Sequence, residues 1–102
     1  MTVKFKVIAN ALFIYLIGEL DEFSALNTRE LIDKIISDYP SVNSVVFNLS
    51  GMSFMDSTGI GMLIGRYKKL KAKKITAYVE SPSVSAQKIL EISGLYKIMP
   101  KI

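Results

Sequence analysis

Three consecutive side chains in the middle of the chain, Asp56, Ser57 and Thr58, are of the types that phosphate chemistry uses. They stand just before an apolar-periodic stretch, where a helix N-terminus needs a side-chain oxygen as its cap. Capping by Asp56 or Ser57 is one interpretation. The other is that Ser57 accepts a phosphoryl group, because a helix N-terminus tolerates an added charge of about −1.5 to −2.

A phosphate on Ser57 has no internal clamp within reach along the same helix. Arg66 lies nine positions further on, more than ~13 Å along the axis at about 1.5 Å per residue. Asp56 is next door and repels a phosphate. We therefore expect phosphorylation to change the surface of the protein more than its fold.

The stretch at residues 57–71 predicts a helix with one apolar side, made up of Ile60, Leu63, Ile64, Tyr67 and Leu70. The opposite side carries Thr58, Gly61, Met62, Gly65 and Lys69, with Ser57 near its edge. A glycine inside a helix costs about 1 kcal/mol relative to alanine. The two glycines indicate either a flat surface that a partner approaches closely, with Met62 as an adaptable apolar contact, or close packing against a neighbouring element, or tolerated instability.

The composition excludes several classes of chemistry. The chain has no Cys and no His, so disulfides, thiolate chemistry and His-based triads are excluded. A receiver-type phosphotransfer enzyme using Asp56 would need an acidic Mg²⁺ pocket, to which only Glu19 and Asp21 can contribute. No P-loop pattern is present. We expect a protein that is not an enzyme and that needs no cofactor and no metal.

Charge and hydropathy limit the partners. The net charge of +4 comes largely from one stretch of basic residues, Arg66, Lys68, Lys69, Lys71, Lys73 and Lys74. Cations near a helix C-terminus are favoured by the helix dipole, and no aromatic residues are interleaved for base stacking, so we expect a solvated helix end and no direct nucleic-acid partner. The N-terminus alternates like a strand rather than a signal peptide, and the apolar run at residues 11–17 is too short to span a bilayer. We expect a cytoplasmic protein without membrane insertion.

The elements that must position these residues follow from hydrophobic periodicity. Strands are expected at residues 3–8, 11–17, 44–49 and 75–79, with a possible short last strand at 95–99, and helices at 24–39, 57–71 and 82–93. Residues 18–21 are expected to leave the sheet, and residues 50–59 to form a turn-rich loop. Expected caps are Asp21 or Ser24 for the first helix, and Ser81 followed by Pro82, with Gly94 at the end, for the third. The order β-β-α-β-α-β-α-(β) predicts an α/β fold, one domain over residues 1–102 with a mixed, mostly parallel sheet of four to five strands and three to four helices.

The run FMDSTGIGMLIGRYKKLK at residues 54–71 resembles the signature of STAS-domain anti-sigma-factor antagonists, the sporulation and general-stress type of Gram-positive bacteria. GELD at 18–21 and ISGLYKI at 92–98 match further family segments in the right order. The resemblance covers nearly the whole chain and implies a STAS domain that acts as a free antagonist.

The resemblance also implies a partner-switching function. The unphosphorylated antagonist would bind an anti-sigma factor that is also a serine kinase, and so free the sigma factor. Phosphorylation would end binding, and a metal-dependent serine phosphatase would restore it. The implied phosphoacceptor is Ser57, with Thr58 as a rival, and Asp21 and Asp56 match acidic positions near the kinase contact. The predicted partner-binding residues are Asp21, Asp56, Ser57, Thr58, Gly61, Met62 and Gly65. The alternative is a STAS accessory subunit that regulates a membrane-transporter ATPase.

Overall fold

One mixed β-sheet organises the chain, and the computed structural model describes all residues from Met1 to Ile102. In chain order the elements are β1 (Thr2–Ile8), β2 (Ala11–Leu20), α1 (Ala25–Asp38), β3 (Ser44–Asn48), β4 (Met52–Met55), α2 (Ser57–Ala72), β5 (Thr76–Glu80), α3 (Val84–Ser93) and the short 3-10 helix η1 (Leu95–Lys97). The predicted α/β class with a mixed, mostly parallel sheet is confirmed, with five strands and three α-helices, but the element order differs from the prediction by the added strand β4 and by the 3-10 helix in place of a last strand.

The sheet has the spatial order β1-β2-β3-β5. A hairpin joins β1 to β2, which are antiparallel, while β2 and β5 both run parallel to β3. The long strand β2 passes beyond β3 and pairs its last residues with β4, also in parallel. Residues 18–20 of the GELD segment therefore stay in the sheet, contrary to the prediction that residues 18–21 leave it. A bulge between Gly18 and Glu19, with Gly18 at a φ of +116°, lets β2 continue to Leu20.

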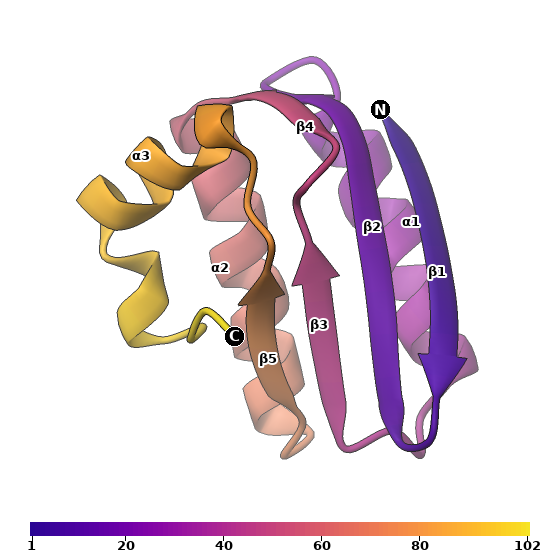
Figure 1. Ribbon diagram of the computed structural model, residues 1–102. Coiled ribbons are helices and arrows are strands. Elements are labelled where there is room, and N and C mark those ends of the chain that lie inside the picture. Colours follow the sequence, from indigo (N-terminus) through magenta and orange to yellow (C-terminus); the bar gives the residue numbers. More distant parts are fainter.

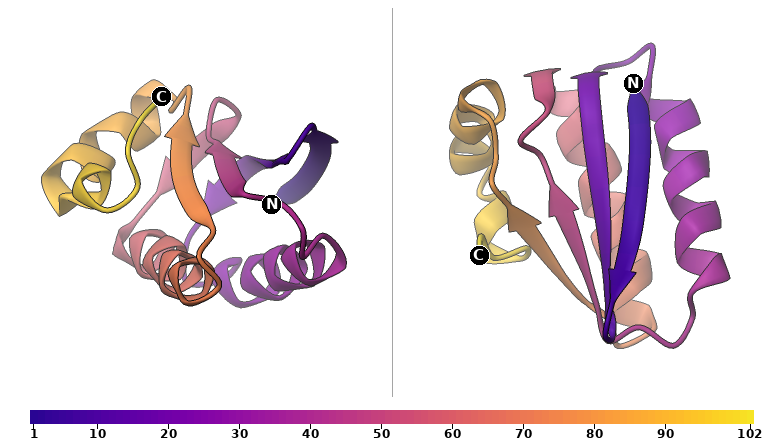
Figure 2. Two further views of the ribbon diagram at one scale, coloured as in Figure 1. Left: turned by 90° about the horizontal axis from the view of Figure 1, so that it is seen from below. Right: turned by 45° about the vertical axis from the view of Figure 1, so that its right-hand side comes forward.

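Two helices cover one face of the sheet. Figures 1 and 2 show α1 and α2 side by side behind the strands, while α3 and the C-terminal segment lie at the β5 edge. Parallel strands need crossover connections, and α1 and α2 supply two of them. The N-terminal ends of both helices therefore follow the carboxyl ends of strands, at the same end of the sheet.

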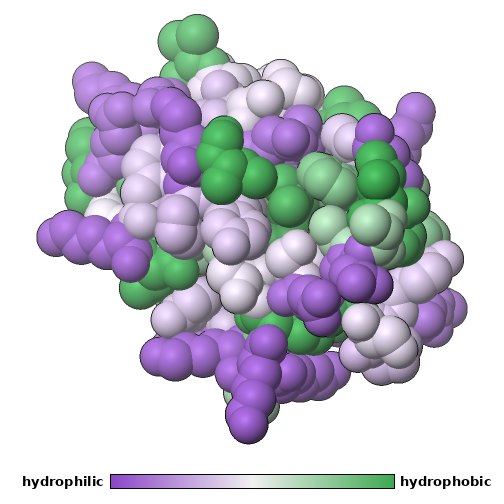
Figure 3. Space-filling view, turned by 60° about the horizontal axis from the view of Figure 1, so that its bottom comes forward, coloured by the Kyte–Doolittle hydropathy of each residue, from purple (hydrophilic) through white to green (hydrophobic).

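The outer surface shows no single dominating apolar area in the view of Figure 3. Small hydrophobic patches are separated there by hydrophilic side chains. A docking surface must therefore be identified from particular side chains rather than from bulk hydropathy.

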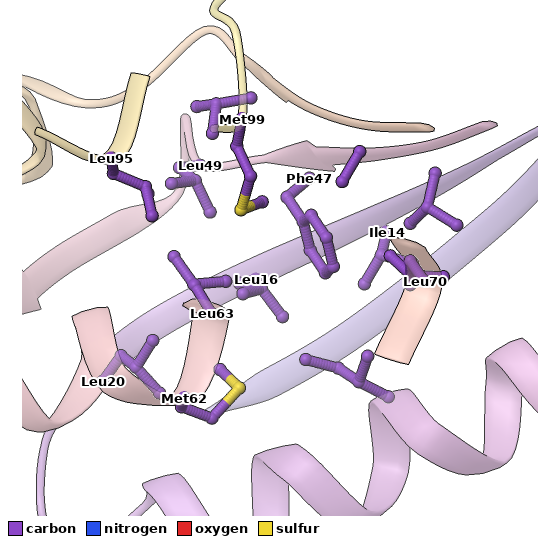
Figure 4. Packing of buried hydrophobic residues seen from close by; sticks show 14 of the residues in the cluster. Ile14, Leu16, Leu20, Phe47, Leu49, Met62, Leu63, Leu70, Leu95 and Met99 are labelled. Atoms are coloured by element: carbon purple, nitrogen blue, oxygen red, sulfur yellow. The ribbon is translucent and has the colours of Figure 1, made fainter. Parts of the chain in front are cut away.

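Most of the core lies between the sheet and helices α1 and α2, and residues of α3 and the C-terminal segment, among them Leu95 and Met99, complete it (Figure 4). Alternate residues of β2 point into it, namely Leu12, Ile14 and Leu16, all fully buried. Phe47 of β3 and Leu63 of α2 are equally buried, and Figure 4 shows Leu63 directed toward Leu16. This packing holds α2 firmly against the sheet, and so fixes the position of its first turn.

Two further predictions about strands were wrong. The segment expected as a loop contains β4, because Met52 and Met55 are buried although the residues around them are turn formers. The expected last strand is the helix η1, after which Lys101 makes an isolated bridge to Val79.

The predictions of helix caps were right in part. Ser83, not Ser81, caps α3, because its hydroxyl accepts a hydrogen bond from the amide of Ala86 at 3.2 Å. Ser24 stands directly before α1, but its side chain makes no cap hydrogen bond. Of the two predicted candidates, Asp21 supplies the acceptor, since its carboxylate accepts hydrogen bonds from the amides of Phe23 and Ser24 in the turn that leads into α1. Gly94 ends α3 in the left-handed conformation, as predicted.

Candidate functional site

The first turn of α2 is capped by Asp56. Its Oδ1 accepts hydrogen bonds from the amides of Thr58 at 3.0 Å and Gly59 at 3.2 Å. These contacts satisfy two of the four amide groups that a helix N-terminus leaves without partners. The capping interpretation therefore holds for Asp56 and not for Ser57.

Ser57 is the first residue of α2, and its side chain is exposed. Its hydroxyl makes no hydrogen bond within the chain, since the cap is made by the residue before it. An exposed hydroxyl beside the positive end of a helix dipole is accessible to an incoming phosphoryl group. Thr58 is exposed as well and lies one position further along the same turn.

The two predicted acidic residues lie at the same edge of the sheet. Leu20 at the end of β2 pairs with Met55 at the end of β4, so the residues that follow, Asp21 and Asp56, emerge from adjacent strands. The amide of Asp56 also lies 3.4 Å from the carbonyl oxygen of Leu20. The fold therefore brings together Asp21, Asp56 and Ser57, which are up to 36 positions apart in the chain.

The helix glycines differ in their surroundings. A Cβ added to Gly61 or to Gly65 would meet no other atom within 4 Å. A Cβ on Gly59 would approach the Cγ atoms of Leu20 and Met55 to 3.0 Å. Close packing within this chain therefore explains Gly59 but neither Gly61 nor Gly65, which leave bare backbone next to open space.

Met62 does not lie on the exposed side of α2, contrary to prediction. Its side chain is only 7% exposed and belongs to the core, and Figure 4 shows it projecting from α2 among buried neighbours. Helix α2 packs against α1 as well as against the sheet, so its buried arc is wider than one amphipathic stripe. Any role of Met62 in partner binding is restricted to the edge that it presents to the groove between the two helices.

That space, which we call the α1–α2 groove, has a volume of about 410 Å³. Its walls combine predicted site residues of α2 with residues around the start of α1 that the sequence analysis did not select. The lining residues are Glu22, Ala25, Leu26, Arg29, Thr58, Gly61, Met62, Gly65 and Arg66. Leu26 is a further exposed apolar side chain at this surface, 58% exposed. The signal in the sequence was an apolar residue on the polar side of the predicted first helix. That Leu26 belongs to a groove can be recognised only when the position of α2 beside α1 is known.

Arg66 was grouped with the solvated basic residues, and the structure places it elsewhere. It is 5% exposed, and its Nε lies 3.0 Å from Oδ1 of Asp33 on α1. Burial lowers the pKa of Arg66 from its ordinary value, and the nearby Arg29 lowers it as well, while Asp33 acts in the opposite direction. The lysines at the end of α2 are exposed as predicted, and Lys69 shares Asp33 at 3.1 Å.

The arrangement suits docking and modification. A small, largely neutral surface formed by Ser57, Thr58, Gly61 and Gly65, which we call the α2 face, borders the groove and lies beside the capping carboxylates. No helix of the structure is long and apolar enough to cross a bilayer.

Comparison with known proteins agrees with these features. The STAS domain family matches residues 2–102. An anti-sigma F factor antagonist of Lysinibacillus sphaericus is 37% identical over 82 residues, which is 80% of this chain and 69% of that protein.

Two solved structures share the fold over 99% of this chain at 28% identity. The anti-sigma factor antagonist SpoIIAA in its unphosphorylated form has a TM-score of 0.79, with 88% of that chain covered. The Bacillus cell fate determinant SpoIIAA in the phosphorylated form has a TM-score of 0.72, with 91% covered. The protein therefore belongs to the STAS domain family, with anti-sigma-factor antagonists among its relatives.

Proposed function

We propose that this protein is a cytoplasmic anti-sigma-factor antagonist and not an enzyme. Its unphosphorylated form binds an anti-sigma factor that is also a serine kinase, and phosphorylation of Ser57 ends that binding. A metal-dependent serine phosphatase resets the switch. The observation that carries the proposal is the hydroxyl of Ser57, which is exposed, makes no hydrogen bond within the chain and lies at the start of the α2 face with its two glycines.

The mechanism follows from desolvation. Docking on the α2 face removes water from the first turn of α2. A phosphate on Ser57 would then have to lose its hydration, which costs several kcal/mol if the charge stays unpaired in the complex. A penalty of about 4 kcal/mol lowers affinity roughly a thousandfold.

The proposed switch needs no refolding. Asp56 supplies the cap through its own carboxylate, so modification of the neighbouring hydroxyl removes none of the hydrogen bonds that start α2. Relatives solved in the unphosphorylated and the phosphorylated form both share this fold, which supports a change confined to the surface.

The test is transfer of phosphate from ATP to this protein by a serine-kinase anti-sigma factor from the same organism. Intact mass is measured for the wild type, Ser57→Ala and Thr58→Ala, with Ser53→Ala as a control, because Ser53 is also exposed and lies nearby on β4. We expect one phosphoryl group on every protein except Ser57→Ala. Modification of Ser57→Ala, or undiminished binding of the phosphorylated wild type to the kinase, would exclude the proposed switch.

A further inference from the structure

The side chains that line the α1–α2 groove include two arginines but a single acidic residue. Arg66 and Lys69 share the single carboxylate of Asp33, with Lys69 at Oδ2 and Arg66 at Oδ1. Arg29 lies in the same groove without an ion pair, and Glu22 is the one acidic residue among the groove's lining.

Arg66 is also poorly satisfied as a hydrogen-bond donor. Its Nε is close to Asp33 but does not point along a hydrogen bond, and its Nη1 has no partner at all. A guanidinium has five N–H donors, and Nε and Nη1 carry three of them, which is costly to leave without acceptors in a side chain that is only 5% exposed. Burial and the neighbouring Arg29 both act against its charge, as the lowered pKa of Arg66 reflects. An anion bound in the groove would accept hydrogen bonds from Arg66 and would also offset the two effects that oppose its charge.

The shape of the groove indicates what kind of anion fits. Gly61 and Gly65 leave open space on the α2 side, so a partner backbone can come close there. Apolar atoms of Ala25, Leu26 and Met62 line the groove next to the arginines. A side chain with an apolar stem and a carboxylate tip matches both surfaces, whereas a free inorganic ion would use only the charge.

We propose that the α1–α2 groove binds an aspartate or glutamate side chain of the docking protein, which Arg29 meets directly at the surface and Arg66 attracts from beneath. This inference rests on the proposed function, since it names the chemistry by which the anti-sigma factor is recognised. It also adds a second cause for release. Thr58 lines the groove, so a phosphate on the adjacent Ser57 stands at its end and repels the incoming carboxylate.

Charge reversal at Arg29 tests the groove without disturbing the core, because Arg29 is exposed. We expect Arg29→Glu to bind the serine-kinase anti-sigma factor ~30-fold more weakly than the wild type in calorimetry. Lys34→Glu is the matched control, because it makes the same change of charge on the same helix at an exposed position outside the groove, and we expect it to stay within about threefold. Replacement of one acidic residue of the kinase by arginine should restore binding to Arg29→Glu and weaken binding to the wild type.

The outcomes separate this inference from the proposed function. If the wild type binds the kinase and Arg29→Glu binds equally well, the groove inference is wrong and the proposed function stands. If the wild type does not bind, the proposed function fails, and sodium acetate serves as the probe of the groove. Saturable shifts of the Arg29 and Arg66 side-chain N–H resonances with acetate, absent with sodium chloride at equal ionic strength, would support a carboxylate site, and unchanged resonances would overturn it.

Discussion

Replacing Gly61 or Gly65 by alanine should stabilise the protein and weaken partner binding at the same time. Both positions lie inside α2, and an added Cβ meets nothing within 4 Å at either one. The substitution therefore gains helix propensity of about 1 kcal/mol with no steric cost in the free protein. For a domain of this size that gain raises Tm by about 4–8 °C.

The opposite effect on stability is expected for Gly59, the third glycine of the same helix. An added Cβ on Gly59 comes within 3.0 Å of the Cγ atoms of Leu20 and Met55, both of them core residues. The crowding should cost about 1–3 kcal/mol, which exceeds the propensity gain. Gly59→Ala is thus a control with the same chemical change in a different environment.

Urea unfolding followed by circular dichroism measures the free energies, and titration with the serine-kinase anti-sigma factor measures affinity. We expect Gly61→Ala and Gly65→Ala to bind about tenfold more weakly or worse, since a methyl group enters the surface that the partner must approach. Lower stability of either variant would refute the finding that the space beside these glycines is open. Unchanged affinity together with higher stability would show that the α2 face is not the docking surface.

Three further outcomes are expected from the same structure. Asp56→Ala should lower the free energy of unfolding by about 1 kcal/mol in urea, because two amide groups at the start of α2 lose their acceptor; no change would mean that the cap contributes nothing. Asp33→Ala should lower the free energy of unfolding by about 2–3 kcal/mol, a value reduced because Asp33 is 30% exposed. Arg66→Met should stay within about 1 kcal/mol of the wild type, because it removes the buried cation together with its need for a partner. Equal losses in the two variants would contradict the view that the cost of Asp33→Ala comes from leaving Arg66 buried without a counter-charge. Phosphorylation of Ser57 should shift amide NMR signals only around the first turn of α2, and shifts across the sheet would indicate refolding.

The fold was predictable because most of its elements carry strong periodic signals. β4 was missed because it is short and half of it is exposed, so the buried pair Met52 and Met55 at its ends shows no alternation. β4 forms only because β2 extends past β3 and offers an unpaired edge. Pairing between distant strands cannot be predicted from a pattern of four residues. The prediction of a last strand at residues 95–99 was wrong for a related reason, since apolar residues over five positions suit a strand and a 3-10 turn equally.

The site was predictable only in part. The cap, the candidate phosphoacceptor and the two outward glycines depend on residue type and helix position, which the sequence displays. The burial of Met62 and Arg66 depends on the contact between α1 and α2. Gly59, Met62 and Arg66 form a second buried stripe of α2 beside the apolar one. The sequence analysis did not identify this stripe, because it placed Met62 with the outward glycines and Arg66 with the solvated basic residues. A cation can occupy such a position because Asp33 of the other helix lies opposite, a pairing across 33 positions of chain.

Separate residues carry the fold and the proposed switch, and this division explains how one phosphate can change binding and leave the fold intact. Asp56 holds the first turn of α2, and Leu63 and Leu70 hold the helix to the sheet. Ser57 takes no part in either task, so a dianion there meets water and the favourable end of the helix dipole. Only a docking protein removes that water, and only then does the charge become costly. The same phosphate is therefore nearly neutral for folding and strongly unfavourable for docking, so the free energy of unfolding and the affinity should respond to it independently.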